Sequence, residues 1–197
     1  MFVLTSCAAG CGRPAVSGST LCAVHLANPE AEVRRIGNYI THQKTVKDLN
    51  AQGLVFENFD FSHCQFYGCN FNGASFSACL FNGAVMRMSF FDFSSLLSCD
   101  FSKTDLQFLS FAGSAIKNCT FEGSELVHIN YGGTVISGTV FDNSNLYNSR
   151  FIEADLSDTG LNNCNLKRAN FIKAKLEGVS FKASNSGEAV FEMEEMD

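Results

Sequence analysis

The chain has 197 residues, of which 46% are hydrophobic and 17% are charged, and its formal net charge is −6. This composition excludes a generally disordered chain, and the negative charge argues against binding to nucleic acid, for which a basic face is expected. Because no apolar run approaches the length that spans a bilayer, we also expect no membrane partner.

The N-terminus resembles a lipoprotein cleavage box at residues 4–7, but no basic region and no apolar segment of sufficient length precede it. A secretory signal is therefore not expected. We predict a cytoplasmic protein, in which cysteines stay reduced or bind metal instead of forming disulfides.

Four potential metal ligands lie close to the N-terminus. Cys7, Cys11, Cys22 and His25 follow the spacing C-x3-C-x10-C-x2-H, in which two close pairs bracket one loop. Three thiolates and one imidazole complete a tetrahedral zinc shell, and structural zinc stabilises segments that cannot bury an apolar core. We therefore predict structural Zn2+ in a zinc-knuckle-like segment, residues 1–28. The alternative is three unrelated thiols and a surface histidine.

Residues 29–53 are predicted to form a helical N-terminal cap. Asn28 is a favourable N-cap residue, and Pro29 suits the first helical position. An apolar stripe follows at helical spacing, formed by Val33, Ile36, Tyr39 and Ile40. We expect this stripe to cover the first coil of the fold that comes next.

From Phe56 to Phe181 a large apolar residue occupies every fifth position, 26 times in succession without a change of register. The residues two positions earlier are mostly small, and six of them are cysteines: Cys64, Cys69, Cys79, Cys99, Cys119 and Cys164. On an extended chain these two positions point to the same side. Because five is odd, the chain must bend once per unit, and the glycines and asparagines two positions after the large residue suit such a bend.

A chain that bends the same way every five residues stacks into a solenoid. Between Leu96 and Leu156 the large residues alternate strictly between aliphatic and aromatic. If each coil has four sides, aromatic residues stack on aromatic residues of the next coil and aliphatic residues on aliphatic ones. This gives two phenylalanine columns on opposite sides. The repeat cysteines are predicted to be buried and inert, since a stacking distance of about 4.8 Å holds thiols in one column too far apart for a disulfide.

The units at residues 69–73 (Cys-Asn-Phe-Asn-Gly), 154–158 (Ala-Asp-Leu-Ser-Asp) and 169–173 (Ala-Asn-Phe-Ile-Lys) resemble the A(D/N)Lxx motif of the pentapeptide-repeat family. The resemblance implies an all-β solenoid, namely a right-handed quadrilateral β-helix with four units per coil. Residues 54–183 would then form about 6.5 coils. Residues 184–197 are expected to form a C-terminal cap and an acidic tail.

No recognisable active site interrupts the repeats. The tract has no insertion, and His42, His63 and His128 lie in no nucleophile motif, so we interpret them as solvated surface histidines. The glycines follow the turn period and open no helix, which excludes a phosphate-binding loop. We therefore expect no enzymatic activity.

Several outward positions are apolar instead of polar: Met88, Phe90, Phe93, Leu97 and Phe108. Met88 and Phe108 should lie above one another in successive coils, and the other three would extend the patch around the coil. A contiguous exposed apolar patch marks an interaction site. We predict a protein-binding scaffold or regulator that docks a protein partner of unknown identity there. The alternative is that the N-terminal segment folds back over these residues.

Some members of the pentapeptide-repeat family inhibit DNA gyrase by imitating the charge and width of DNA, and these usually dimerise through the C-terminal coil. The resemblance therefore leaves a homodimer open and makes DNA mimicry, directed at gyrase or another DNA-binding protein, the alternative function. Residues 54–183 contain 12 acidic and 9 basic residues, and residues 167–182 are locally basic. This weak acidity places DNA mimicry second.

Overall fold

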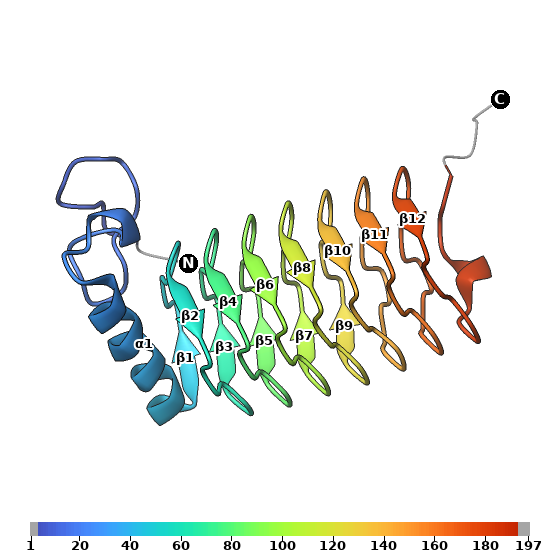
Figure 1. The fold of residues 1–197 in the computed structure, drawn as a ribbon, viewed down its shortest axis with the longest axis horizontal. Coiled ribbons are helices and arrows are strands. Elements are labelled where there is room, and N and C mark those ends of the chain that lie inside the picture. Colours follow the sequence, from blue (N-terminus) through green and yellow to red (C-terminus); the bar gives the residue numbers. More distant parts are fainter. Residues whose placement is uncertain (1–3, 193–197) are drawn as a thin grey trace.

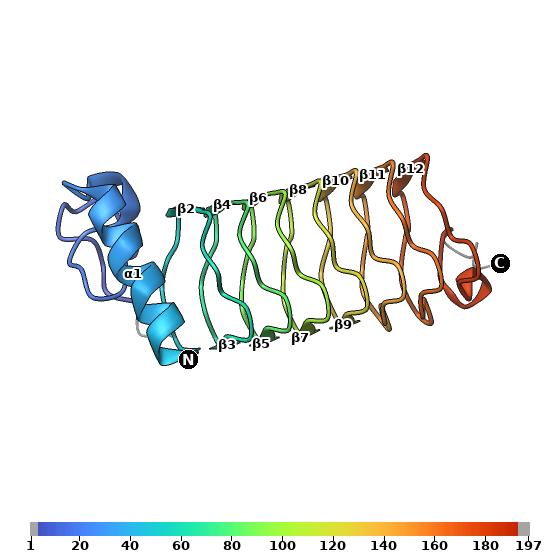
Figure 2. The same ribbon diagram turned by 60° about the horizontal axis from the view of Figure 1, so that its bottom comes forward.

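The computed structural model describes residues 4–192 and shows an elongated rod (Figure 1). The chain starts with a compact segment that contains the 3-10 helix η1 (Ala23–His25), continues through helix α1 (Pro29–Gln43) and then winds into a parallel β-solenoid. The N-terminal segment and α1 stand at one end of the rod, and the last coil stands at the other (Figure 2). No helix in the described residues is long and apolar enough to cross a membrane.

The solenoid is built from short strands that pair with the coils before and after them. They are β1 (Thr45–Lys47), β2 (Val55–Glu57), β3 (Gln65–Tyr67), β4 (Ser75–Ser77), β5 (Val85–Arg87), β6 (Ser95–Leu97), β7 (Asp105–Gln107), β8 (Ala115–Lys117), β9 (Glu125–Val127), β10 (Val135–Ser137), β11 (Asp155–Ser157) and β12 (Lys175–Glu177). One sheet has the order β1-β3-β5-β7-β9 and the other β12-β11-β10-β8-β6-β4-β2. Partners are twenty residues apart, as in Phe56 opposite Phe76, and isolated bridges repeat this spacing on the two remaining sides. Four five-residue units therefore make one coil, as predicted.

The bend in each unit falls two positions after the large apolar residue. From Asp48 to Ala183 every such residue has φ between 48° and 72°. This left-handed conformation costs a non-glycine residue roughly 1 kcal/mol. The corner amide donates to the next coil, as the Phe93 N–H does to the Ala112 carbonyl at 2.9 Å, and these bonds hold the corners in place.

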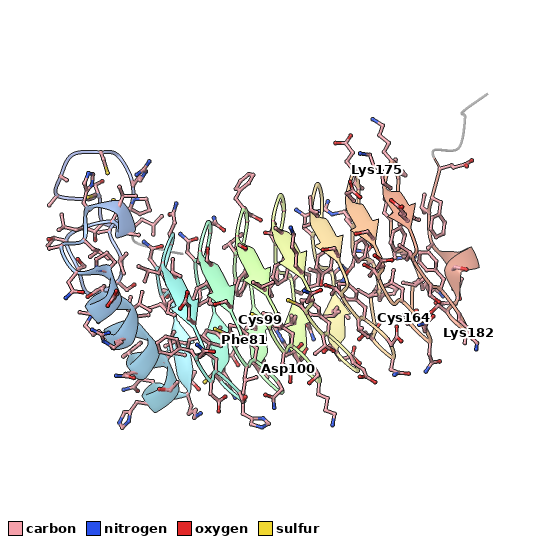
Figure 3. All side chains as sticks on the ribbon, viewed as in Figure 1. Phe81, Cys99, Asp100, Cys164, Lys175 and Lys182 are labelled. Carbon is pink, nitrogen blue, oxygen red and sulfur yellow. The ribbon has the colours of Figure 1, made fainter. Side chains whose placement is uncertain are left out.

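Two stacked aromatic columns fill opposite sides of the coil, as the alternation predicted. One contains Phe71, Phe91, Phe111, Tyr131, Phe151 and Phe171, and the other Phe61, Phe81, Phe101, Phe121 and Phe141. Successive ring centroids within these columns are 4.4–5.5 Å apart. The six repeat cysteines are buried free thiols beside them, with Cys99 near Phe81 inside the coil (Figure 3).

The solenoid begins earlier than the register counted from Phe56 predicted. Helix α1 ends at Gln43, Lys44 adopts a φ of 58°, and β1 pairs with β3 from Thr45 onward. Val46 and Ala51 are buried at the inward positions. With this start the fold has about seven coils instead of 6.5. The sequence signal is weak here because valine and alanine are smaller than the residues that follow in the register.

At the C-terminal end one more unit joins the coil, since Val190 bridges Asn170 and the Phe191 ring stacks on Phe171 at 5.1 Å. The 3-10 helix η2 (Ser186–Glu188) precedes this unit. Leu176, predicted to point inward, is 38% exposed. No residue among 4–192 continues this column beyond Leu176, which accounts for the exposure of the side chain in the described structure.

Helix α1 closes the N-terminal end. Val33, Ile36 and Ile40 are buried, whereas Tyr39, predicted in the same stripe, is 45% exposed. Gly37 lets α1 approach the first coil, because a Cβ atom there would lie 2.0 Å from the Phe59 ring. The helix therefore works as a cap, although only part of its predicted stripe contributes.

Candidate functional site

Cys7, Cys11, Cys22 and His25 converge at the N-terminal end, with their ligand atoms all within 4.8 Å of one another. The Sγ atoms of Cys11 and Cys22 are 3.7 Å apart, and His25 Nδ1 lies 3.5 Å from Cys7 Sγ and 3.4 Å from Cys22 Sγ. A tetrahedral zinc ion with its usual bond lengths has S–S edges of about 3.8 Å and S–N edges of about 3.6 Å. The donor atoms therefore fit a Cys3His shell.

Hydrogen bonds within the N-terminal segment change the pKa of individual ligands in different directions. The Cys22 amide donates to Cys7 Sγ at 3.3 Å. This bond, assisted by the Ala9 amide and the His25 ring, lowers the pKa of the Cys7 thiol to about 6. The thiols of Cys7 and Cys22 in turn raise the pKa of His25. Since this pKa lies below 7, Cys7 is mostly a thiolate at neutral pH, and the thiolate is the form that binds metals.

The metal-ligand segment is tied to the first coil through Asn50, which is buried. Its side-chain amide donates to the Ala15 carbonyl at 2.6 Å, and its backbone amide donates to Ser17 Oγ at 2.8 Å. Arg35 of α1 also donates to the Ser17 carbonyl. Asn50 also accepts from the Asn70 side chain at 2.9 Å, so the segment is joined to the first two coils.

The five apolar residues predicted to form a patch lie on two neighbouring sides of the rod and the two corners beside them. Met88 and Phe108 occupy the same corner in successive coils, Phe90 lies on the next side, and Phe93 occupies the corner after it. Leu97 lies on the side beyond, in β6. Met88, Phe93 and Phe108 are 60%, 76% and 56% exposed, so no described residue covers them, whereas Phe90 is half-buried.

Sequence reasoning missed an aromatic and polar column that continues from Phe108. The Phe108 ring stacks on His128 with centroids 4.9 Å apart, and His128 Nδ1 lies 2.6 Å from the Asn148 side-chain nitrogen. The Tyr147 ring meets His128 edge-on at 5.8 Å, and its hydroxyl accepts from Arg168 at 3.1 Å. His128 is thus a packed residue. The twenty-residue spacing could have revealed this column.

A comparison with solved structures found several that are similar to this chain, three of which follow. HetL, a pentapeptide repeat protein involved in heterocyst differentiation regulation from the cyanobacterium Nostoc sp. strain PCC 7120, is 12% identical, with 82% of this chain and 96% of HetL covered and a TM-score of 0.37. A trypsin-treated form of QnrB1, a plasmid-mediated fluoroquinolone resistance protein, is 22% identical. The match covers 74% of this chain and 71% of QnrB1, with a TM-score of 0.35. Rfr23, a pentapeptide repeat protein from the cyanobacterium Cyanothece 51142, is 12% identical. The match covers 80% of this chain and 99% of Rfr23, with a TM-score of 0.32.

Two family models match the sequence itself. The model of a pentapeptide repeat region matches residues 116–191, and the model of eight pentapeptide repeat copies matches residues 49–83 and 60–92. A search of curated proteins found no match. Together the matched residues make up more than half of the chain and coincide with the paired coils. The chain therefore belongs to the pentapeptide-repeat family.

Proposed function

We propose that the protein is a non-catalytic scaffold that binds another protein through its exposed apolar residues, Met88, Phe90, Phe93, Leu97 and Phe108. The observation that carries this proposal is that Met88, Phe93 and Phe108 occupy left-handed corners, with φ of 50°, 57° and 57°. A bulky exposed side chain there adds backbone strain and apolar surface without filling the core, whereas glycine or asparagine suits the conformation better. Docking explains these residues better than folding does.

The rigidity of the solenoid supports this function. The Phe93 amide donates to Ala112 at 2.9 Å and the Phe108 amide to Val127 at 3.3 Å, so the corners are held by the next coil. Little backbone entropy is then lost when a partner binds. Aromatic anchors near the centre of an interface contribute about 2 kcal/mol or more each.

The charge distribution favours protein docking over DNA mimicry, which needs a continuous acidic face. Two carboxylates of the repeats are paired with lysines one coil away, Asp155 with Lys175 at 3.7 Å and Glu153 with Lys173 at 3.5 Å. Such pairs reduce the negative field that a DNA-binding protein would meet. We expect no inhibition of gyrase supercoiling at low micromolar protein, and clear inhibition would favour DNA mimicry.

We further infer that the N-terminal ligands hold a structural zinc ion: Cys7, Cys11, Cys22 and His25. Three donor distances of 3.4–3.7 Å, close to the edges of a tetrahedral zinc shell, and the lowered pKa of Cys7 support this inference. Four protein ligands leave no position for a substrate, which is typical of structural sites. When bound, zinc would supply the folding free energy that this short segment cannot gain from an apolar core.

Affinity capture from the native host tests the docking function. The double variant Phe93→Asn/Phe108→Asn should keep the fold, because asparagine tolerates the left-handed conformation. A matched control is Leu80→Asn, which removes another exposed apolar side chain from the side opposite Phe90. We expect the double variant to lose a protein that the wild type and the control both capture.

Two results would contradict the proposal. If the double variant melts like the wild type and captures the same proteins, these side chains do not form the interface. If it unfolds instead, Phe93 and Phe108 serve the stability of the chain.

A further inference from the structure

Two columns of side chains run side by side along the rod, from the exposed apolar residues towards the C-terminus. One occupies a corner and contains Met88, Phe108, His128, Asn148 and Arg168. The other lies on the adjoining side and contains Phe90, Ser110, Asn130 and Arg150. We call these nine residues the docking strip.

The docking strip changes character along its length. Its first part is apolar, with Met88 and Phe108 exposed. Its middle is polar and internally hydrogen-bonded. Asn130 donates to Ser110 at 3.2 Å, and in the corner column the side chains of His128 and Asn148 contact each other. Its last part consists of exposed arginines. A partner therefore meets an apolar surface at one end and positive charge at the other.

Arg150 and Arg168 are free to bind an anion. Within residues 4–192 neither guanidinium forms an ion pair, and the carboxylates in the adjacent units already pair with lysines, Glu153 with Lys173 at 3.5 Å and Glu188 with Lys167 at 3.4 Å. The two arginines lie in neighbouring columns one coil apart. Guanidinium groups bind carboxylates through paired hydrogen bonds, which gives both charge and geometric selectivity.

Arg168 is also held in place. Its Nη1 donates to the Tyr147 hydroxyl at 3.1 Å, and its guanidinium carbon lies 6.0 Å from the centroid of that ring. Because Tyr147 also contacts His128, the cationic end is connected to the aromatic column. Less side-chain entropy is lost when such a fixed arginine binds an anion.

We propose that the docking strip recognises an extended acidic segment of the partner protein, with an apolar side chain on Met88 and Phe108 and a carboxylate between Arg150 and Arg168. This inference rests on the proposed scaffold function and specifies the chemistry of the partner. Three coils separate Phe108 from Arg168, a distance of about 14 Å at about 4.8 Å per coil. Since an extended chain rises about 3.3 Å per residue, the two recognised side chains lie about four residues apart.

Single-stranded nucleic acid would also find aromatic rings and arginines here. However, Asp92, whose carboxylate accepts from Ser110, borders the strip, and the chain as a whole carries a net charge of −6. A polyphosphate backbone needs a continuous basic track. The observations therefore favour a peptide with a few carboxylates.

Selection from a random peptide library displayed on phage, against the immobilised full chain, tests the proposal. We expect the enriched peptides to share an apolar residue and an acidic residue about four positions apart. A synthetic enriched peptide should bind the Arg150→Glu/Arg168→Glu variant about tenfold more weakly and should lose binding to Phe108→Asn. Lys182→Glu, close to the Ser180 column on the opposite side of the rod, is the matched charge control and should leave binding unchanged.

The outcomes separate this inference from the scaffold function. Enriched peptides that depend on Phe108 but carry no acidic residue would overturn the acidic-segment proposal and leave the scaffold function in place. Peptides that bind Phe108→Asn as well as the wild type, or the absence of any enriched class, would overturn both. An oligodeoxythymidylate that binds more tightly than the best peptide would overturn the proposal in favour of nucleic acid.

Discussion

Replacement of Tyr131 by phenylalanine should stabilise the protein, although most core substitutions destabilise. Tyr131 is fully buried, with its ring 5.5 Å from that of Phe111 and 4.6 Å from that of Phe151, and its hydroxyl has no hydrogen-bond partner among the described residues. An unsatisfied buried hydroxyl costs about 1–3 kcal/mol. Phenylalanine keeps both stacking contacts and leaves a void of one oxygen atom, which costs about 0.3 kcal/mol. The net gain is about 1–2 kcal/mol.

Equilibrium urea unfolding of the full chain measures this gain. The midpoint should rise by roughly 0.5 M in Tyr131→Phe. The matched control Phe151→Tyr adds a hydroxyl to the same dry column and should lower the midpoint. A less stable Tyr131→Phe protein would refute the reasoning, because the hydroxyl would then have a partner inside the coil.

The pH dependence of stability gives an independent check on Tyr131. Burial raises the pKa of its hydroxyl above the ordinary value of 10.0. Above that pH the unfolded chain ionises while the folded chain stays neutral, so the wild type is fully stabilised only below pH 10.0. The advantage of Tyr131→Phe should therefore widen above this pH by about 1.4 kcal/mol per unit. If the difference in stability between Tyr131→Phe and the wild type does not change above pH 10.0, the hydroxyl reaches solvent.

Protein purified without chelator should contain one zinc ion per chain, and metal analysis should show its loss in Cys11→Ser; full occupancy in that variant would contradict the ligand set. Acidification should release bound zinc, because protons compete with the metal for the ligand thiolates and imidazole, and retention at about pH 3 would contradict the ligand set. Phe111→Ala should cost about 3–5 kcal/mol in urea unfolding, because it leaves a cavity in a stacked column, and a neutral result would place Phe111 outside the core. Gly37→Ala should destabilise by about 1–3 kcal/mol, since its Cβ would overlap the Phe59 ring, and an unchanged melting temperature would mean that α1 does not pack there.

The coil could be predicted from the sequence because every unit meets the same physical demand. A large inward residue, a small one two positions before it and a left-handed corner two positions after it recur at fixed spacing, so one unit predicts the next. The metal ligands were also predictable, because Cys7, Cys11, Cys22 and His25 are close in sequence. Their spacing alone, however, gives neither the donor distances nor the hydrogen bond from the Cys22 amide to Cys7 Sγ.

Contacts between different units could not be predicted in the same way. Phe59 occupies a position that usually holds a small residue, and its ring packs against Gly37 of α1, a contact that the repeat pattern does not show. Asn50 precedes the register counted from Phe56, yet it joins the N-terminal segment to the coil. His128 looks like a surface residue until the twenty-residue stacking places it between Phe108 and Asn148. These features depend on neighbours that the sequence brings together only after the coil has formed.

Site-specific photo-crosslinking in cells of the native host tests the docking function most directly. A benzoylphenylalanine introduced in place of Phe108 retains an aromatic ring at the exposed corner, where it would contact a bound partner. We expect irradiation to link this position to the same protein that a probe in place of Phe93 captures, whereas a probe in place of Leu80, on the opposite side, captures none. No crosslinked protein from either corner, or an equal yield from the position of Leu80, would contradict the account.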